Sequence, residues 1–167
     1  MEDLQEDLQF PKEGKKHIDD FLRVSGVSVV SKKRSRRLNS AGTVEHIYLV
    51  YLSRKNEKPR SLELVYFPEP WNSIKPQFRI SYCAELAYGP KEVKKFRNSD
   101  LLGKIRKMKG RPNGLVVRFL DHVIPDGVDG ITFLAERVDP ANNDEWHKLA
   151  RYAGTVDSMA RAYAGKK

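Results

Sequence analysis

Hydrophobic and polar residues alternate most clearly between Pro76 and Gly89. Apolar or aromatic side chains recur at every second position from Phe78 to Tyr88, with mostly polar residues between them. A period of two over a dozen residues predicts a β-strand with one face in a core and the other in solvent. Shorter apolar runs bounded by turn residues predict further strands over 27–37, 43–53, 62–67, 115–123 and 131–138. The run from Ile47 to Leu52 is apolar throughout, which predicts a central strand covered on both faces.

Apolar spacings of three and four predict helices in three other regions. Pro11 suits the first turn of a helix over 11–24, which Gly26 can end. The apolar positions of 90–109 change phase near Asn98 and Ser99, so we expect two short helices, over 90–97 and 99–109. Asn142 or Asn143 can cap a last amphipathic helix that ends near Gly165.

These elements predict an α+β fold. We expect a mainly antiparallel sheet of about six strands, because short turns join most neighbouring strands. The N-terminal helix, the pair of short middle helices and the long C-terminal helix would pack on this sheet. The 167 residues suit one domain, so we assign 11–167 to a single domain and 1–10 to an acidic N-terminal extension.

Composition narrows the class of protein. No apolar run approaches the roughly 18 residues that a transmembrane helix needs, and the acidic first residues do not resemble a signal peptide. The single cysteine, Cys83, cannot form an internal disulfide. We therefore expect an intracellular protein, cytoplasmic or nuclear, without a transmembrane segment.

Charge is distributed unevenly along the chain. The net charge is +9, but residues 11–118 contain 25 Lys or Arg and 10 Asp or Glu, whereas residues 1–10 contain four acids and no base. Like charges on one surface repel, and a polyanionic partner relieves that repulsion. The basic middle section therefore favours a polyanion as partner, with nucleic acid as the main candidate.

Two basic segments are candidate phosphate-binding elements. The first is a hairpin arm with five bases in six residues, namely Lys32, Lys33, Arg34, Arg36 and Arg37. The second is the middle helical region, where the candidates are Lys94, Lys95, Arg97, Lys104, Lys107 and Arg111. We expect folding to bring both onto one basic face. The alternative interpretation is a charged edge strand that resists aggregation and a solvated helix face.

Trp71 is the aromatic residue best placed for contact with a ligand. It lies in a proline-flanked loop, where its ring can be exposed and can stack on a base. The other aromatic residues of the basic region occupy strand positions with apolar neighbours, which is typical of core residues.

A third group of candidates is acidic. It surrounds the last predicted hairpin and comprises Asp121, His122, Asp126, Asp129, Glu136 and Asp139. Carboxylates beside a basic groove can hold Mg²⁺ for phosphodiester cleavage, and a solvated turn rich in Asp is the alternative. The four histidines lack metal-ligand spacing, and there is no glycine-rich phosphate loop.

The sequence favours a protein that binds DNA or RNA through the phosphate backbone, with little sequence specificity, no catalysis and no cofactor. An alternative is a structural or adaptor protein that binds an acidic protein or an anionic membrane, with its acidic ends contacting a second copy in self-association. A second alternative is a Mg²⁺-dependent nuclease.

Overall fold

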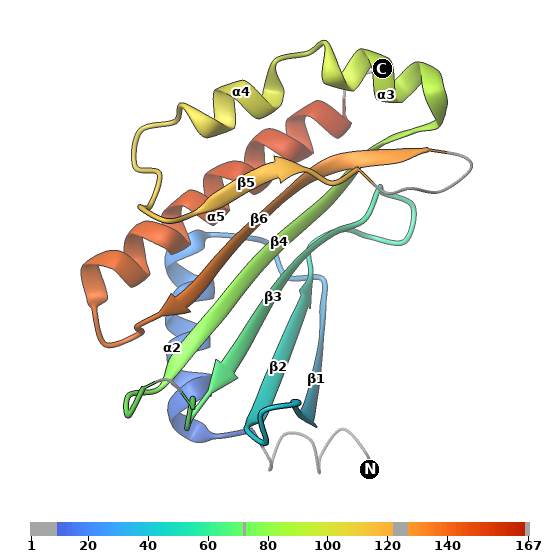
Figure 1. Cartoon of the computed structure of the whole chain (residues 1–167). Helices are drawn as coiled ribbons and strands as arrows, with labels where there is room; N and C mark the ends of the chain where they lie inside the picture. Colours follow the sequence, from blue (N-terminus) through green and yellow to red (C-terminus); the bar gives the residue numbers. More distant parts are fainter. Residues whose placement is uncertain (1–9, 72, 122–126, 166–167) are drawn as a thin grey trace.

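A computed structural model of the chain describes residues 10–71, 73–121 and 127–165. Six strands form one antiparallel sheet in the order β1-β2-β3-β4-β6-β5 (Figure 1). The strands are β1 (Ser31–Leu38), β2 (Val44–Tyr51), β3 (Arg60–Phe67), β4 (Gln77–Tyr88), β5 (Val116–Phe119) and β6 (Val128–Val138). The helices are α2 (Lys12–Ser25), α3 (Gly89–Arg97), α4 (Leu101–Arg106) and α5 (Asn143–Ala164). The predicted α+β fold is confirmed.

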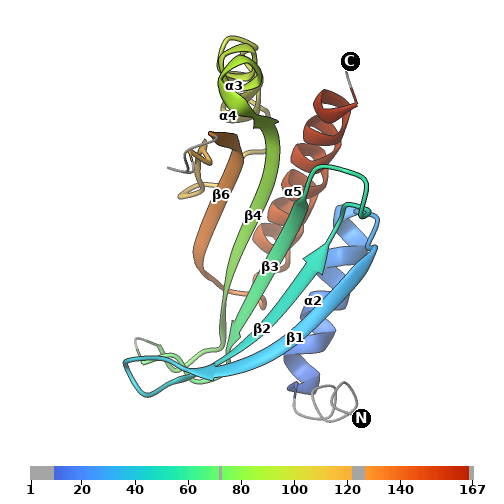
Figure 2. The same ribbon diagram turned by 90° about the vertical axis from the view of Figure 1, so that its right-hand side faces the viewer.

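The two longest helices, α2 and α5, lie side by side on one face of the sheet (Figure 2). The short helices α3 and α4 follow β4; α3 lies at that end of the sheet, whereas α4 packs on the edge strand β5 (Figure 1). In the part of the chain that the structure describes, no helix covers the other face of the sheet. We call the two faces the helix side and the open side.

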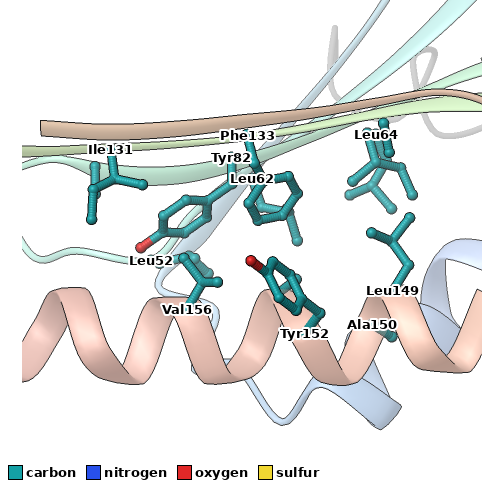
Figure 3. Packing of buried hydrophobic residues seen from close by; sticks show 14 of the residues in the cluster. Leu52, Leu62, Leu64, Tyr82, Ile131, Phe133, Leu149, Ala150, Tyr152 and Val156 are labelled. Carbon is teal, nitrogen blue, oxygen red and sulfur yellow. The ribbon is translucent and has the colours of Figure 1, made fainter. Parts of the chain in front are cut away.

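The core fills the space between the sheet and α5 (Figure 3). Tyr82 and Phe133 stack with their ring centroids 5.5 Å apart, and Trp146 packs edge-on against Phe21. Phe78 and Trp146 are both fully buried, with their centroids 4.8 Å apart. The alternating apolar positions of β4 thus face the helix side, as the sequence predicted.

Local sequence explains where the long helices begin and end. α2 follows Pro11 and stops at Gly26, whose φ of 71° places it in the left-handed region and whose N–H donates to Leu22 O. The side chain of Asn142 accepts a hydrogen bond from the N–H of Glu145 at 3.3 Å, so the predicted cap of α5 is confirmed.

A glycine permits close packing of the two long helices. A Cβ atom at Gly154 of α5 would lie 1.9 Å from the carbonyl oxygen of Ser25, at the end of α2. Any larger residue at Gly154 would force the helices apart, so this position fixes how closely α2 packs on α5.

Several strand predictions need correction. β5 ends at Phe119, so Leu120 and Asp121 of the strand predicted over 115–123 lie outside it, and β6 begins at Val128 rather than at Ile131. The first strand begins at Ser31 rather than at Val27, because residues 27–30 form the connection from α2. The strand that contains Ile47 is not central, since β2 is the second strand from the edge. Tyr48 and Val50 are buried on the helix side, whereas Ile47 and Leu49 are only half-buried on the open side.

The break between the middle helices is present but differs in detail. Asp100, with a φ of 62°, occupies the cap position before α4, and its side chain makes no cap hydrogen bond. The hydroxyl oxygen of Ser99 accepts the N–H of Leu101, the first residue of α4, at 3.4 Å, and the hydroxyl donates to Phe96 O at 2.5 Å. α4 ends at Arg106, three residues before the predicted end.

The packed region includes Phe10, which is 7% exposed and lies against the rings of His46 and Tyr48. Residues 1–9 of the predicted acidic extension lie outside the described residues. Among the described helices, none combines the length and hydropathy needed to cross a bilayer.

Candidate functional site

The basic arm forms the edge strand β1. Only β2 pairs with it in the sheet, and seven of its eight residues are exposed. The strand opposes Lys32 to Val50, Arg34 to Tyr48 and Arg36 to His46. Residues directly opposite each other in an antiparallel pair share a face. Because Val50 and Tyr48 are core residues, these three cations lie on the helix side.

The three helix-side cations form a row along an exposed edge. Same-side residues of a strand lie about 6.7 Å apart, so the row has a regular spacing. The Arg34 guanidinium lies over the Tyr48 ring at 5.7 Å from its centroid. Within the described part of the chain, Lys32 and Arg36 have no hydrogen-bond or ion-pair partner. Their charges therefore face solvent.

The other two cations of the arm lie on the open side and differ from each other. Arg37 pairs with Glu45, whose side chain is buried and also lies 3.5 Å from Asn39 Nδ2. Lys33 is exposed and has no such partner among the described residues. Arg37 is thus partly neutralised by the fold, and Lys33 is not.

Trp71 lies near the far end of the arm. It is 76% exposed, in agreement with the sequence, and it lines a hollow of about 220 Å³. Glu45 and Phe67 line the same hollow, and the Arg79 guanidinium lies 5.6 Å from the Phe67 ring centroid. The fold therefore brings an exposed indole close to the Arg37–Glu45 pair.

The second basic segment does not join the arm across the sheet. α4 packs on β5, and β5 and β1 are opposite edges of the six-stranded sheet. At about 4.8 Å per strand, these edges are roughly 24 Å apart. The expectation of one shared basic face is therefore wrong for Lys104 and Lys107.

α3 lies closer to the beginning of β1. Lys58, in the turn after β2, pairs with Glu92 of α3 at 3.2 Å and also donates to Leu86 O. Since Ser31 pairs with Tyr51 at the end of β2, α3 and the start of β1 belong to the same end of the sheet. Lys94 and Lys95 of α3 are both exposed.

Arg97 has a structural role. Its Nε donates to Asp129 at 2.5 Å, its Nη2 donates to Asp121 at 2.8 Å, and its guanidinium lies 4.9 Å from the Phe119 ring centroid. Asp129 is 1% exposed. Because Arg97 neutralises a buried carboxylate, its charge is not available to a phosphate.

Arg111 also binds within the protein. Its Nη2 donates to Leu115 O at 2.7 Å, and its Nη1 lies 3.4 Å from Arg106 O. The neighbouring Arg106 donates from Nε and Nη2 to Val117 O. These two arginines fasten α4 and the following loop to β5.

The acidic candidates do not form a recognisable metal site. Asp121 and Asp129 are both bound to Arg97, Asp139 accepts the Ala141 N–H, and Glu136 is exposed. His122 and Asp126 lie outside the described residues. Among the residues that the structure describes, no three His, Cys, Asp or Glu side chains gather closely enough to hold a metal ion.

Two pKa shifts describe the surroundings of the site. Burial, followed by the nearby charge of Arg36, lowers the pKa of His46 below 6.5. His46 is therefore neutral at pH 7 beside the row of cations. Burial, followed by Glu85, raises the pKa of Cys83 to about 11, so this thiol is protonated at neutral pH and is a poor nucleophile.

A group of arginines at the beginning of β1 was not predicted from the sequence. Arg54, Arg60 and Arg161 line a hollow beside Val30, together with Asp157 of α5. One signal was available, because Asp157 lies at helical spacing within the buried stripe of α5, next to Val156 and four residues after Ala153. An acid on the buried side of a helix indicates a buried cationic partner.

Comparison of the chain with protein-family models, with curated proteins and with solved structures gives no match.

Proposed function

We propose that the chain binds nucleic acid through the phosphate backbone, along the helix side and outer edge of β1. The observation that supports this proposal is the edge strand itself, which presents five cations in eight residues and contains no acid. Each phosphate that is neutralised by Lys or Arg releases condensed counterions, which favours binding at low salt. No base-reading element is required, so sequence specificity is low.

The geometry of β1 suits an extended polyanion. Eight residues of strand span about 27 Å, and Lys32, Arg34 and Arg36 alternate along it on one side. Arginine adds a planar fork that can hold two phosphate oxygens at once. Trp71 lies at the open-side hollow beside Glu45, so it is not part of this row, and an unpaired base that stacks on it must pass around the outer edge of β1.

The deciding experiment measures binding as a function of salt. The full chain is titrated against labelled single-stranded DNA, single-stranded RNA and duplex DNA by fluorescence anisotropy, between about 50 and 200 mM salt. Lys32, Lys33 and Arg36, which have no hydrogen-bond or ion-pair partner among the described residues, predict a slope of log K against log salt of about −2 for single strands and about −3 for duplex.

Two further titrations test the adaptor alternative. One uses vesicles that contain anionic lipid, and the other uses polyglutamate, both under the same conditions. Binding to vesicles or polyglutamate with no binding to any nucleic acid would overturn the proposal. Incubation of the nucleic acids with Mg²⁺ tests for cleavage, and shortened products would contradict a function without catalysis.

A further inference from the structure

A hollow of about 360 Å³ lies at the end of the sheet where β1 begins. Its wall includes three arginines from separate elements. Arg54 comes from the turn after β2, Arg60 from the start of β3, and Arg161 from the last turn of α5. Guanidinium groups repel one another, so their convergence on one hollow indicates a site for an anion.

Arg60 forms the rigid part of this wall. Its side chain is 4% exposed, its Nη1 donates to Asp157 at 2.6 Å, and its Nη2 donates to Leu52 O at 2.9 Å. The hydroxyl of Tyr82 also donates to Asp157, at 2.7 Å. A guanidinium has five N–H donors, so three donors of Arg60 are not used within the described residues. Its position is fixed before any ligand binds.

The other two arginines supply charge that the fold does not neutralise. Within the described part of the chain, the guanidinium groups of Arg54 and Arg161 have no hydrogen-bond or ion-pair partner. Two carboxylates also line the hollow. Asp157 is bound to Arg60, and Glu57 accepts the backbone N–H of Arg54 at 3.0 Å. Three guanidinium groups against two carboxylates leave one positive charge in excess.

The hollow continues the row of cations on β1. Val30, the residue before β1, lines the hollow. Its N–H donates to Tyr51 O, so the pairing with β2 continues to Val30. Lys32 is the next same-side residue, about 6.7 Å further along. A strand of nucleic acid that lies along Arg36, Arg34 and Lys32 therefore ends at the three arginines.

We propose that this hollow, lined by Arg54, Arg60 and Arg161, binds a phosphate monoester, and that its source is the terminal phosphate of a nucleic acid strand lying along β1. The assignment of the ligand to the end of a nucleic acid strand rests on the proposed function, whereas the phosphate site itself does not. A monoester carries about −1.5 to −2 charges at pH 7 and three free oxygens, more than an internal diester offers. Arginine forks match that arrangement of oxygens.

The test uses one oligonucleotide sequence in three forms, with a 5′-phosphate, with a 3′-phosphate and with neither. We expect one phosphorylated form to bind about tenfold more tightly than the unphosphorylated form, as one or two charge-assisted hydrogen bonds imply. In the variant R54Q/R161Q this difference should vanish. In R118Q/R151Q, which removes the same charge from two exposed arginines elsewhere, it should persist. Circular dichroism checks that both variants are folded.

A second readout separates the site from the nucleic acid. Inorganic phosphate alone is titrated into the full chain, and the Nε–H resonances of Arg54 and Arg161 are followed by NMR. If these resonances shift but no oligonucleotide binds, the phosphate site stands and the proposed function fails. If all three oligonucleotides bind equally, the terminal-phosphate site is overturned while the proposed function stands. If inorganic phosphate leaves the resonances of Arg54 and Arg161 unchanged and neither phosphorylated oligonucleotide binds more tightly than the unphosphorylated one, the inference fails.

Discussion

The edge strand β1 and the segment from α3 to the loop after α4 are both rich in cations, yet the fold uses their charges differently. In the helical segment the arginines are bound within the protein, as with Arg97 on Asp129 and Arg111 on Leu115 O. On β1, Lys32, Lys33 and Arg36 have no partner in the described part of the chain. The difference teaches that a basic segment indicates a binding surface only where its charges are left over after folding.

Neighbouring acids explain the difference. Arg97 faces Asp129 and Asp121, which lie far along the chain and reach α3 only through the sheet. No residue of β1 is acidic, and the one buried acid beside it, Glu45, pairs with Arg37. Within the described residues, Lys32, Lys33 and Arg36 of β1 therefore remain uncompensated, whereas Lys95 of α3 lies near the carboxylate of Glu92.

The largest expected effect concerns nucleic acid affinity. In K32Q/K33Q/R36Q the slope of log K against log salt for single strands should become less steep by about 2. The gain in affinity between 1 M and 0.1 M salt is then about 100-fold smaller than in the unaltered protein. The matched variant K104Q/K107Q/K109Q removes three exposed lysines of α4 and the loop that follows it, near the opposite edge, and should retain the slope. Fluorescence anisotropy measures both, and equal losses in the two variants would show that β1 has no special role.

The next effect concerns stability. Arg97→Gln leaves the buried carboxylate of Asp129 without its cation, so the free energy of unfolding should fall by about 2 kcal/mol. Arg36→Gln removes an exposed charge and should change it by less than about 0.5 kcal/mol. Urea unfolding followed by circular dichroism measures both variants. A stability loss of similar size in Arg36→Gln would mean that β1 is also structural.

A smaller effect concerns the pKa of His46. Burial lowers this pKa and the nearby charge of Arg36 lowers it further, so a polyanion that binds at β1 should raise it, and NMR titration of the His46 ring protons can follow the change. In Arg36→Gln the pKa should already be higher in the free protein. An unchanged His46 pKa in a saturated complex would place the nucleic acid elsewhere.

The smallest effect concerns stability against pH. Because the pKa of His46 is lower in the folded state than the unfolded value of 6.5, the unfolded state binds more protons as the pH falls through 6.5. The His46 contribution to stability is present above pH 6.5 and is lost below it, and the loss should be smaller in Arg36→Gln. Thermal unfolding at a series of pH values from 7 downward tests this, and an equal loss in both proteins would contradict it.

Much of the fold could be predicted from the sequence, because period and capping are local properties. The alternation of β4 and the Asn142 cap of α5 are examples. The sequence predicted that the strand containing Ile47 is covered on both faces. Ile47 and Leu49 instead face the open side, on which no described helix lies. An apolar run does not reveal whether a second layer exists.

The candidate site was predictable only in part. The sequence identified β1 as a basic segment and Trp71 as exposed, because neither depends on distant partners. It could not show that Arg97 is bound to Asp121 and Asp129, which follow it by 24 and 32 residues. It also missed the convergence of Arg54, Arg60 and Arg161, since pairing over a separation of 97 residues fixes Arg60 against Asp157.

The outer edge of β1 has one more consequence, for how copies of the protein behave toward each other. Its backbone N–H and C=O groups on that edge have no neighbouring strand in the described sheet, and an exposed edge is a template for fibril-like stacking. The cations of the strand keep two such edges apart by repulsion, and that repulsion weakens as salt shortens the Debye length. Turbidity or light scattering of the ligand-free protein should therefore increase as the ionic strength is raised.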